Sequence, residues 1–318
     1  MNISVAGGEV AGEDLGVTLT HEHVVVTSPE TWAAWPDLLG SYEQLVATCA
    51  SALSQVRERN SLATMIDPTT PDLGRNVPFL EQVAARSGVN LVLGTGSWTR
   101  PPLTYLSRTA TELGEFFVRE ITEGFASSAR SRAGIIKVAC AEGVSKDELK
   151  ILRAAAHAQL ATGVPIIGHG DGPNRSHQTM TAIFESLGVA PDRVCLAHIH
   201  DSADRGYLAE MAGRGYWLGF DRFPGGFRSG PQPAERIDVL AELIESGYGP
   251  QIAVSHDWSV RATLFDADDE RDYHDRYNPD GFSYLFDRVV PALTERGIAD
   301  ALQMLFIDNP RRLLTGSA

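Results

Sequence analysis

The sequence predicts an α/β protein built as one (β/α)8 barrel of the TIM type. Short apolar runs rich in β-forming residues alternate with longer segments of helical periodicity, which is typical of parallel sheets with crossover helices. Eight such runs occur along the 318 residues, and no linker rich in Pro or Ser divides them. Eight alternating units favour a closed barrel over an open doubly wound sheet. We therefore expect residues 1–318 to form a single domain.

Each expected strand is a short apolar run that is followed by a helix-like segment. The runs are VTLTHEHV from Val17, SLATMIDP from Ser61, NLVLGTG from Asn90, AGIIKVAC from Ala133, VPIIGHG from Val164, RVCLAHIH from Arg193, YWLGFDR from Tyr216 and QIAVSHDW from Gln251. Several of the helix-like segments end at Gly, a common helix stop. The connections 223–233 and 259–282, after the seventh and eighth strands, are long or rich in helix breakers. We expect them to crown the active-site face as lids or specificity elements.

The composition excludes several classes of partner. The formal net charge of −14 disfavours a nucleic-acid surface or adhesion to anionic membranes, because phosphate contacts need clustered Lys and Arg. The first ten residues lack the features of a signal peptide, and no run is long and apolar enough to span a membrane. The widely spaced Cys49, Cys140 and Cys195 show no CxxC pattern, so we expect them to be reduced and mostly buried. The sequence thus predicts a cytoplasmic protein that acts on small molecules.

Ligand-type side chains end five of the eight expected strands. They are His21 and His23 in the first run, Lys137 in the fourth, His169 in the fifth, His198 in the sixth and Asp257 in the eighth. Side chains two apart on a strand share a face, so His21 and His23 are both expected to point toward the barrel axis. The C-terminal strand ends of such barrels meet at one mouth, where catalysis takes place. Imidazole and carboxylate groups gathered there suit zinc, iron, cobalt or manganese.

The alternative for any single histidine is a hydrogen-bonded, partly buried structural role. We expect that role for His157 and His177, which lie in or beside helix-like segments. His200 is expected to support the site or the fold, and His256 to point away from the mouth by strand alternation. The six strand-end residues differ because polar groups aimed into a barrel mouth cost free energy unless something binds them.

Lys137 does not fit a metal site as a protonated amine, because an ammonium group cannot ligate a cation. Desolvation and nearby metal charge are expected to lower its pKa and favour the neutral amine. A neutral amine can react with carbon dioxide to give a carbamate, an anion able to bridge two metals. The residue pattern alone leaves a salt-bridged lysine as an equal alternative.

Several of these segments together resemble the phosphotriesterase family of the amidohydrolase superfamily. The similarity rests on GVTLTHEHV, IIKVA, IIGH, LAHIHDSAD followed by GYWLGFDRF, SHDW and the terminal DNPRRLL, which run along nearly the whole chain. The resemblance implies a binuclear centre. His21, His23 and Asp257 would hold the more buried of two divalent metals, with zinc the first expectation, and His169 and His198 the more exposed one. Lys137, as an N6-carboxylated lysine, and a hydroxide would bridge them.

The same resemblance implies a hydrolase, of the lactonase type within the family. Phosphotriesterase-like lactonases carry an Arg that matches Arg222, and they have a Tyr-rich segment after the third strand. This chain reads GSWTR there, which places Trp98 and Arg100 where tyrosines are usual. Arg100 could recognise an anionic group or be a solvated loop residue. Trp258, which follows the Asp ligand, could wall the substrate pocket or pack beneath the eighth loop.

We expect Asp257 to accept and relay a proton from metal-activated water, and Arg222 to position the substrate or stabilise its oxyanion. The expected substrate is a lactone or related ester, with phosphotriesters as secondary substrates. Another carboxylic ester, an amide or a carbamate is the first alternative, and a metal- or ligand-binding barrel without turnover is the second. Family members are often homodimers, so the resemblance implies a homodimer here.

Overall fold

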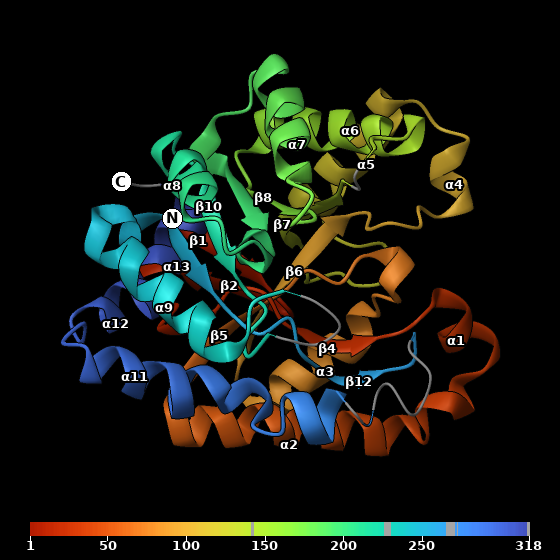
Figure 1. Ribbon diagram of the computed structural model, residues 1–318. Coiled ribbons are helices and arrows are strands. Elements are labelled where there is room, and N and C mark those ends of the chain that lie inside the picture. The colour runs from red at the N-terminus through yellow and green to blue at the C-terminus, as the bar shows by residue number, and fades with distance from the viewer. Residues whose placement is uncertain (141–142, 226–229, 265–270, 272, 317–318) are drawn as a thin grey trace.

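The computed structural model describes residues 1–318 except 141–142, 226–229, 265–270, 272 and 317–318. Its centre is an eight-stranded parallel sheet, with helices packed around the outside (Figure 1). The strands, in spatial order, are β11 (Ile252–Val254), β10 (Trp217–Phe220), β9 (Val194–Ala197), β8 (Ile166–His169), β7 (Ala133–Ala139), β6 (Asn90–Gly96), β5 (Leu62–Asp67) and β3 (Val17–Leu19). Each lies within one of the eight predicted runs.

The two outer strands of this sheet approach each other and close the barrel. Thr20, directly after β3, donates from its backbone N (3.4 Å) and from Oγ1 (2.9 Å) to the carbonyl oxygen of Val254 in β11. Because neighbouring strands are parallel throughout, all eight C-terminal ends lie at one mouth. The predicted (β/α)8 barrel is confirmed.

Helices cross over between successive strands, as the alternating pattern predicts. They are α2 (Tyr42–Asn60), α3 (Val77–Ser87), α5 (Ala110–Thr122), α6 (Lys146–Thr162), α7 (Ser176–Ser186), α8 (Arg205–Gly213) and α9 (Pro233–Leu243), followed by α11 (Val290–Glu295), α12 (Ala301–Gln303) and α13 (Asn309–Thr315). Two short helices, α1 (Pro29–Ala34) and α4 (Leu103–Leu106), lie in strand-to-helix connections.

Local sequence explains where these helices begin and end. In α6, the Ser145 side chain accepts from the backbone N of Glu148, whose own side chain accepts from the Ser145 backbone, and the helix stops at Gly163 with φ +75°. None of the helices in the described residues is long and apolar enough to cross a membrane.

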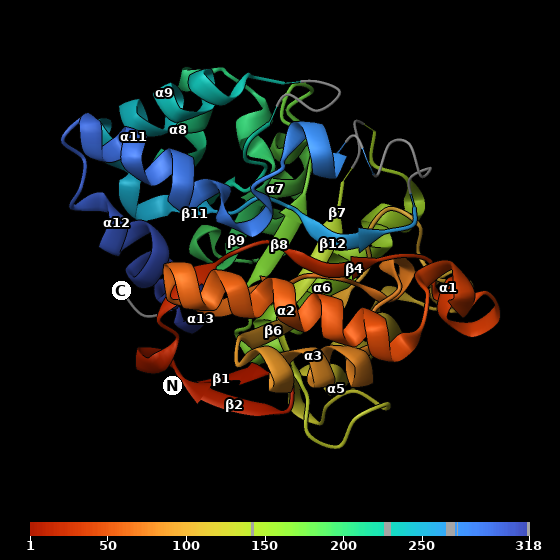
Figure 2. The same ribbon diagram turned by 90° about the horizontal axis from the view of Figure 1, so that it is seen from below.

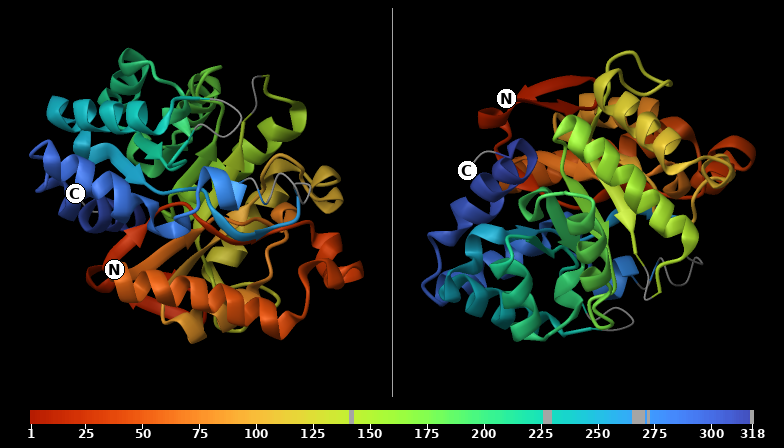
Figure 3. Two further views of the ribbon diagram at one scale, coloured as in Figure 1. Left: turned by 60° about the horizontal axis from the view of Figure 1, so that its bottom comes forward. Right: turned by 90° about the horizontal axis from the view of Figure 1, so that it is seen from above.

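The core has two layers. Apolar residues between the sheet and the helices form the larger cluster. Inside the barrel a smaller cluster contains alternate strand residues such as Ile66, Val92, Ile135 and Ile167. The N-terminal hairpin of β1 (Asn2–Val5) and β2 (Gly8–Ala11), which the sequence pattern did not predict, adds Ile3 and Val5 to this inner cluster and so covers the end of the barrel opposite the mouth. This hairpin and α13, the last described helix, lie on the same side of the molecule (Figure 3).

The first predicted strand is wrong in one respect. VTLTHEHV is not a single strand: β3 ends at Leu19, a bend follows, and β4 (His23–Val26) starts a separate pairing. β4 runs parallel to β12 (Ser259–Ala262), with Ser259 opposite His23 (Figure 2). The connection after the eighth strand therefore supplies a strand that lies against the segment with the predicted ligand His23. Whether the connections at 223–233 and 259–282 act as lids is a prediction that falls partly on residues outside the described ones.

The cysteine prediction is confirmed for burial. Cys49, Cys140 and Cys195 are all buried and free of disulfide bonds.

Candidate metal centre

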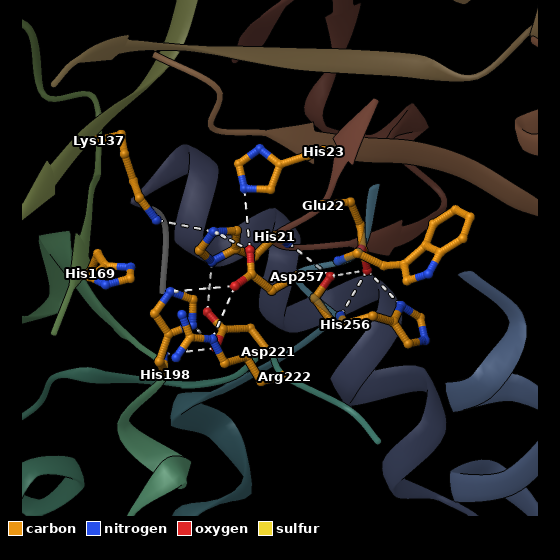
Figure 4. Close-up of polar contacts among 12 residues, drawn as sticks. His21, Glu22, His23, Lys137, His169, His198, Asp221, Arg222, His256 and Asp257 are labelled. Carbon is orange, nitrogen blue, oxygen red and sulfur yellow. Dashed lines mark hydrogen bonds and ion pairs between the residues drawn. The ribbon is translucent and has the colours of Figure 1, made fainter. Parts of the chain in front are cut away.

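The strand ends deliver all six predicted ligand residues to one cavity. His21 lies in the bend after β3, His23 begins β4, Lys137 lies in β7, His169 ends β8, and His198 and Asp257 follow β9 and β11 (Figure 4). They line a cavity of about 870 Å³ at the mouth of the barrel. Its size and mixed polar and apolar walls are typical of sites for small molecules.

Asp257 lies at the centre of this cluster. Its Oδ1 is 3.2 Å from Nε2 of His23 and 3.6 Å from Nε2 of His21, and its Oδ2 is 3.8 Å from Nε2 of His198. One potential ligand atom from each of His21, His198 and Asp257 lies within 4.8 Å of the others. His198 and Asp257 both have left-handed backbones, with φ of +64° and +54°. Such conformations are rare outside glycine and cluster at functional sites.

A buried carboxylate that the sequence analysis missed orients two of these histidines. Asp221, directly after β10, accepts from Nδ1 of His21 (2.7 Å) and from Nδ1 of His198 (3.0 Å). A carboxylate only accepts hydrogen bonds, so each ring carries its proton on Nδ1 and presents the lone pair of Nε2 to the cavity. Burial alone would raise the pKa of Asp221, but His21, which bonds to it, and the other groups around it together lower the pKa to about 2. Asp221 stands beside Arg222 at a strand end, which was the one available sequence signal.

His23 is fixed by a different group. Its Nδ1 lies 2.7 Å from Oγ1 of Thr69, which follows β5. Asp67 links the segments that carry Thr69 and His23. Its Oδ1 accepts from the backbone N of Thr69, and its Oδ2 accepts from the backbone N of Val24. Support of this kind for a ligand histidine is common in metal sites.

The donor set fits divalent metal ions. Burial, followed by the charges of Lys137 on His21 and of Arg222 on His169 and His198, lowers the pKa of all three histidines. They are therefore neutral ligands at physiological pH. Asp257 supplies an anion. Burial works against its charge, but the groups around it, among them the charged Arg222 that donates to Oδ2, hold the pKa of Asp257 well below the usual range.

Lys137 is buried among the ligands, with its Nζ 3.0 Å from Nε2 of His21. An amine N–H donated to Nε2 occupies the lone pair that a metal would use. Burial lowers the pKa of Lys137 to about 8, which favours the neutral amine. An unmodified ammonium at this place and a metal on His21 are therefore mutually exclusive, whereas a carboxylated lysine would be a further anionic ligand.

His169 is contacted by Trp98 from the segment after β6. The indole Nε1 donates to Nδ1 of His169 over 3.3 Å, and Asp72 fixes this segment by accepting from the backbone N of Trp98 and of Arg100. In this arrangement the proton of the His169 ring lies on Nε2, so a metal could bind His169 only at Nδ1, in place of the hydrogen bond from Trp98. Trp98 and Arg100 both line the cavity, as predicted, and Arg100 is exposed at its rim.

Arg222 reaches Asp257 from the end of β10. Its Nε donates to Oδ2 of Asp257 (3.0 Å), and its Nη1 donates to Oδ2 of Asp201 (2.8 Å). Although burial opposes the charge, Asp201 and Asp257 raise the pKa of Arg222, so the guanidinium stays charged. Asp201 is in turn held by the buried Arg236, through an Nη2 to Oδ1 hydrogen bond of 2.7 Å.

Comparison with known proteins agrees with this geometry. The family model described as the phosphotriesterase family matches residues 1–314. An aryldialkylphosphatase from Saccharolobus solfataricus is 30% identical over 323 residues, which covers 99% of this chain and 100% of the relative. This chain belongs to the phosphotriesterase family. Also similar are a phosphotriesterase homology protein from Mycobacterium tuberculosis, at 33% identity over 98% of this chain and 97% of the relative, and an N-acetyltaurine hydrolase from Salmo salar, at 27% over 97% and 96%.

Membership of the phosphotriesterase family confirms the resemblance found in the sequence and supports a metal-dependent hydrolase. The lactone substrate, the identity of the metals and the individual residue roles stay predictions. For Trp258 the structure favours the packing alternative: its ring packs against Phe282 at a centroid distance of 4.5 Å, and it is not among the described residues that line the cavity.

Three of the remaining histidines take supporting places. The expectation of a partly buried place is wrong for His157, which is exposed on α6. His200 stacks on Phe220, and His177 bonds the carbonyl oxygen of Ala197. His256 turns its ring to Glu22 instead of to the ligand cluster (Figure 4).

Proposed function

We propose that this member of the phosphotriesterase family is a binuclear metal-dependent hydrolase that cleaves a lactone or a related ester. The observation that carries the proposal is the cluster of neutral imidazoles around Asp257, with two of the rings oriented by one buried carboxylate. Polar groups gathered in this way at a barrel mouth are costly unless they bind something.

In this proposal His21, His23 and Asp257 would hold one metal, His169 and His198 would hold the other, and Lys137 as a carbamate would supply a further anionic ligand. Zinc suits the donor set, and iron, cobalt or manganese are compatible with it. Bound divalent metals lower the pKa of water to provide a nucleophile near neutral pH, and they polarise the scissile carbonyl or phosphoryl group.

Asp257 is the proposed proton acceptor. Its low pKa keeps the carboxylate ionised at rest, and its position among the imidazole nitrogens would bring it next to a metal-bound nucleophile. Arg222 fixes Oδ2 of Asp257 and keeps its own positive charge beside the reacting group. Within the described residues, the hydrogen bonds of Arg222 use Nε and Nη1, which leaves Nη2 to bind a substrate oxygen and its developing negative charge.

The cavity wall supports an ester with an apolar part. Val26, Leu103 and Leu264 line it above the ligand cluster, and the side chains of Leu103 and Leu264 are exposed in the absence of substrate. Burying such side chains against a substrate chain contributes roughly 25 cal/mol per Å² of apolar surface removed from water.

The test is turnover of lactones, phosphotriesters and simple esters by the wild-type protein and by Asp257→Asn. We expect lactone hydrolysis that falls at least about 100-fold in kcat in the variant, the size of a lost general base, with the thermal unfolding profile retained. An Asp257→Asn variant with a nearly normal rate would remove Asp257 from the mechanism. A wild-type protein that is inactive on every ester would favour the amide alternative or a barrel that binds without turnover.

A second candidate is hydrolysis of an amide whose amine part is anionic. Arg100 is an exposed cation on the cavity rim, and the side-chain interactions found in the described residues do not engage its guanidinium. A guanidinium recognises carboxylate or sulfonate groups well, and N-acetyltaurine hydrolases are among the relatives. Under this candidate, Arg100→Gln raises the KM for N-acetyltaurine and leaves that for an uncharged N-acetyl amine unchanged. Equal effects on both compounds would reject recognition by Arg100.

The assembly is proposed to be a homodimer. Light scattering after size-exclusion chromatography, compared with the 34.4 kDa chain mass, measures this directly.

A further inference from the structure

Glu22, the residue between His21 and His23, has an environment unlike that of its neighbours. It is fully buried, and its carboxylate faces the segment that carries Asp257 and not the cavity (Figure 4). It accepts four hydrogen bonds from this segment: from Oγ of Ser255 (2.6 Å), from the backbone N of His256 (2.8 Å), from Nδ1 of His256 (2.6 Å) and from the backbone N of Trp258 (3.0 Å).

Two of these donors flank Asp257 in the chain. The backbone N–H groups of His256 and Trp258 stand immediately before and after it in the chain, and Glu22 holds both. Between them Asp257 has the left-handed φ of +54°, which is unfavourable for a residue with a side chain and persists only where its surroundings impose it. Glu22 is thus in direct contact with the two peptide groups that determine where the Asp257 carboxylate points.

The same two segments are joined at three further points. The backbone N of His21 donates to Oγ of Ser255 (2.9 Å), that of Asp257 to the carbonyl oxygen of His21 (3.1 Å), and that of His23 to the carbonyl oxygen of Trp258 (2.8 Å). Because Ser255 Oγ accepts from His21 and donates to Glu22, the contacts form one continuous network. The segment that carries His21 and His23 is therefore joined to the segment that carries Asp257 by one hydrogen-bond network.

A carboxylate is required in this place. The His256 ring accepts at Nε2 from the backbone N of Leu285 (3.1 Å), so its proton lies on Nδ1 and points at Glu22. Four donors then converge on one side chain, and only a group without N–H or O–H of its own can accept from all of them. Burying an unneutralised carboxylate is costly. An uncharged residue could link the two segments with a smaller desolvation free energy, so a purely structural link would not need a carboxylate.

We propose that Glu22 is a positioning residue, which sets the Asp257 carboxylate against His21 and His23 and thereby fixes the affinity of the buried metal site. The proposal rests on the proposed function, because it assumes that these three residues ligate a metal. It assigns a role to the middle residue of the HxH sequence, whose side chain lies outside the ligand cluster.

The test compares wild type with Glu22→Gln, an isosteric change whose amide N–H₂ would face one of the four donors. The matched control is Glu120→Gln. Glu120 is a partly buried carboxylate that accepts hydrogen bonds from Arg75 and Thr95, and it does not line the cavity. Metal content of the folded protein is measured by elemental mass spectrometry after dialysis against graded chelator, together with thermal unfolding. Loss of a supporting partner in metal sites typically lowers metal affinity by about 10- to 100-fold.

We expect Glu22→Gln to release metal at a chelator concentration at least about 10-fold lower than wild type, and Glu120→Gln to release it as wild type does, even though both unfold at lower temperature. Equal retention in Glu22→Gln and wild type would overturn the proposal and leave the proposed function intact. A wild type that retains no metal after reconstitution would overturn both. If Glu22→Gln is not recovered folded, Ser255→Ala removes one of the four donors; it is expected to release metal more readily than wild type, and unchanged retention would overturn the proposal.

Discussion

The strongest prediction concerns Asp221, whose carboxylate sets the tautomer of two ligand histidines. In Asp221→Asn one oxygen is replaced by an N–H₂ group, which must face the Nδ1 of either His21 or His198. That ring can then only accept at Nδ1, so its proton moves to Nε2 and blocks the atom that would bind the metal. The substitution therefore removes one imidazole from the ligand set without changing the volume of the core.

The size of the effect follows from these contacts. Loss of a carboxylate behind a metal-bound histidine costs about 10- to 100-fold in metal affinity, or about 1.4 to 2.7 kcal/mol. The pKa of Asp221, lowered from 3.8 to about 2, corresponds to about 2 kcal/mol of stability for the metal-free fold. Because the folded-state pKa is depressed, this stability is present above about pH 4 and is lost as the pH falls toward about 2.

The assay is chelator titration with metal analysis, combined with denaturant unfolding of the metal-free protein at pH 7 and at pH 3. We expect weaker metal retention, and a stability deficit at pH 7 that narrows at pH 3. Asp204→Ala is the control, because it removes an exposed N-cap carboxylate of α8 and costs about 1 kcal/mol without touching the site. An Asp221→Asn protein with wild-type metal retention would refute the argument that Asp221 fixes the ligand tautomers.

Two further predictions follow from the same cluster. Lys137→Met keeps the buried volume but removes the amine. We expect the metal content of this variant to fall by about half and its kcat to fall by at least about 100-fold. Full metal loading in the variant would reject a bridging role for Lys137. Removing bound metal with a chelator should lower the unfolding temperature, because free metal at about 100 times its Kd stabilises the fold by about 2.7 kcal/mol; an unchanged unfolding temperature would show that the fold does not bind metal at this site.

Much of the barrel was predictable because its strands are buried on both faces and therefore read as short apolar runs with a polar group at the end. The run at Val17 shows the limit of this argument. Its residues alternate like a single strand, but the chain bends at Thr20 and His21. After the bend, the backbone N of Asp257 donates to the carbonyl oxygen of His21, and the backbone N of His23 donates to that of Trp258. Those partners lie more than 230 residues away, and local sequence carries no sign of them.

The ligand residues could be found because each has a metal-binding side chain at a strand end. The residues that orient them could not be found in this way. Asp221 and Glu22 have no distinguishing sequence pattern, and only the fold shows that they bond to histidines far away in the chain. For Trp258 the sequence left open whether the ring walls the pocket or packs beneath the eighth loop, and its contact with Phe282 favours packing. Position in the sequence thus predicted which residues lie near the barrel mouth. The direction of each side chain depends on tertiary contacts that the sequence does not show.

The central claim is that the strand-end cluster holds two divalent metals, and it is tested most directly by the metal content per chain of protein purified without chelators. Elemental mass spectrometry should find about two equivalents, either as purified or after reconstitution with metal and bicarbonate. Essentially no bound metal after reconstitution would contradict the account. The neutral imidazoles around Asp257, two of them oriented by Asp221, would then not form a metal site.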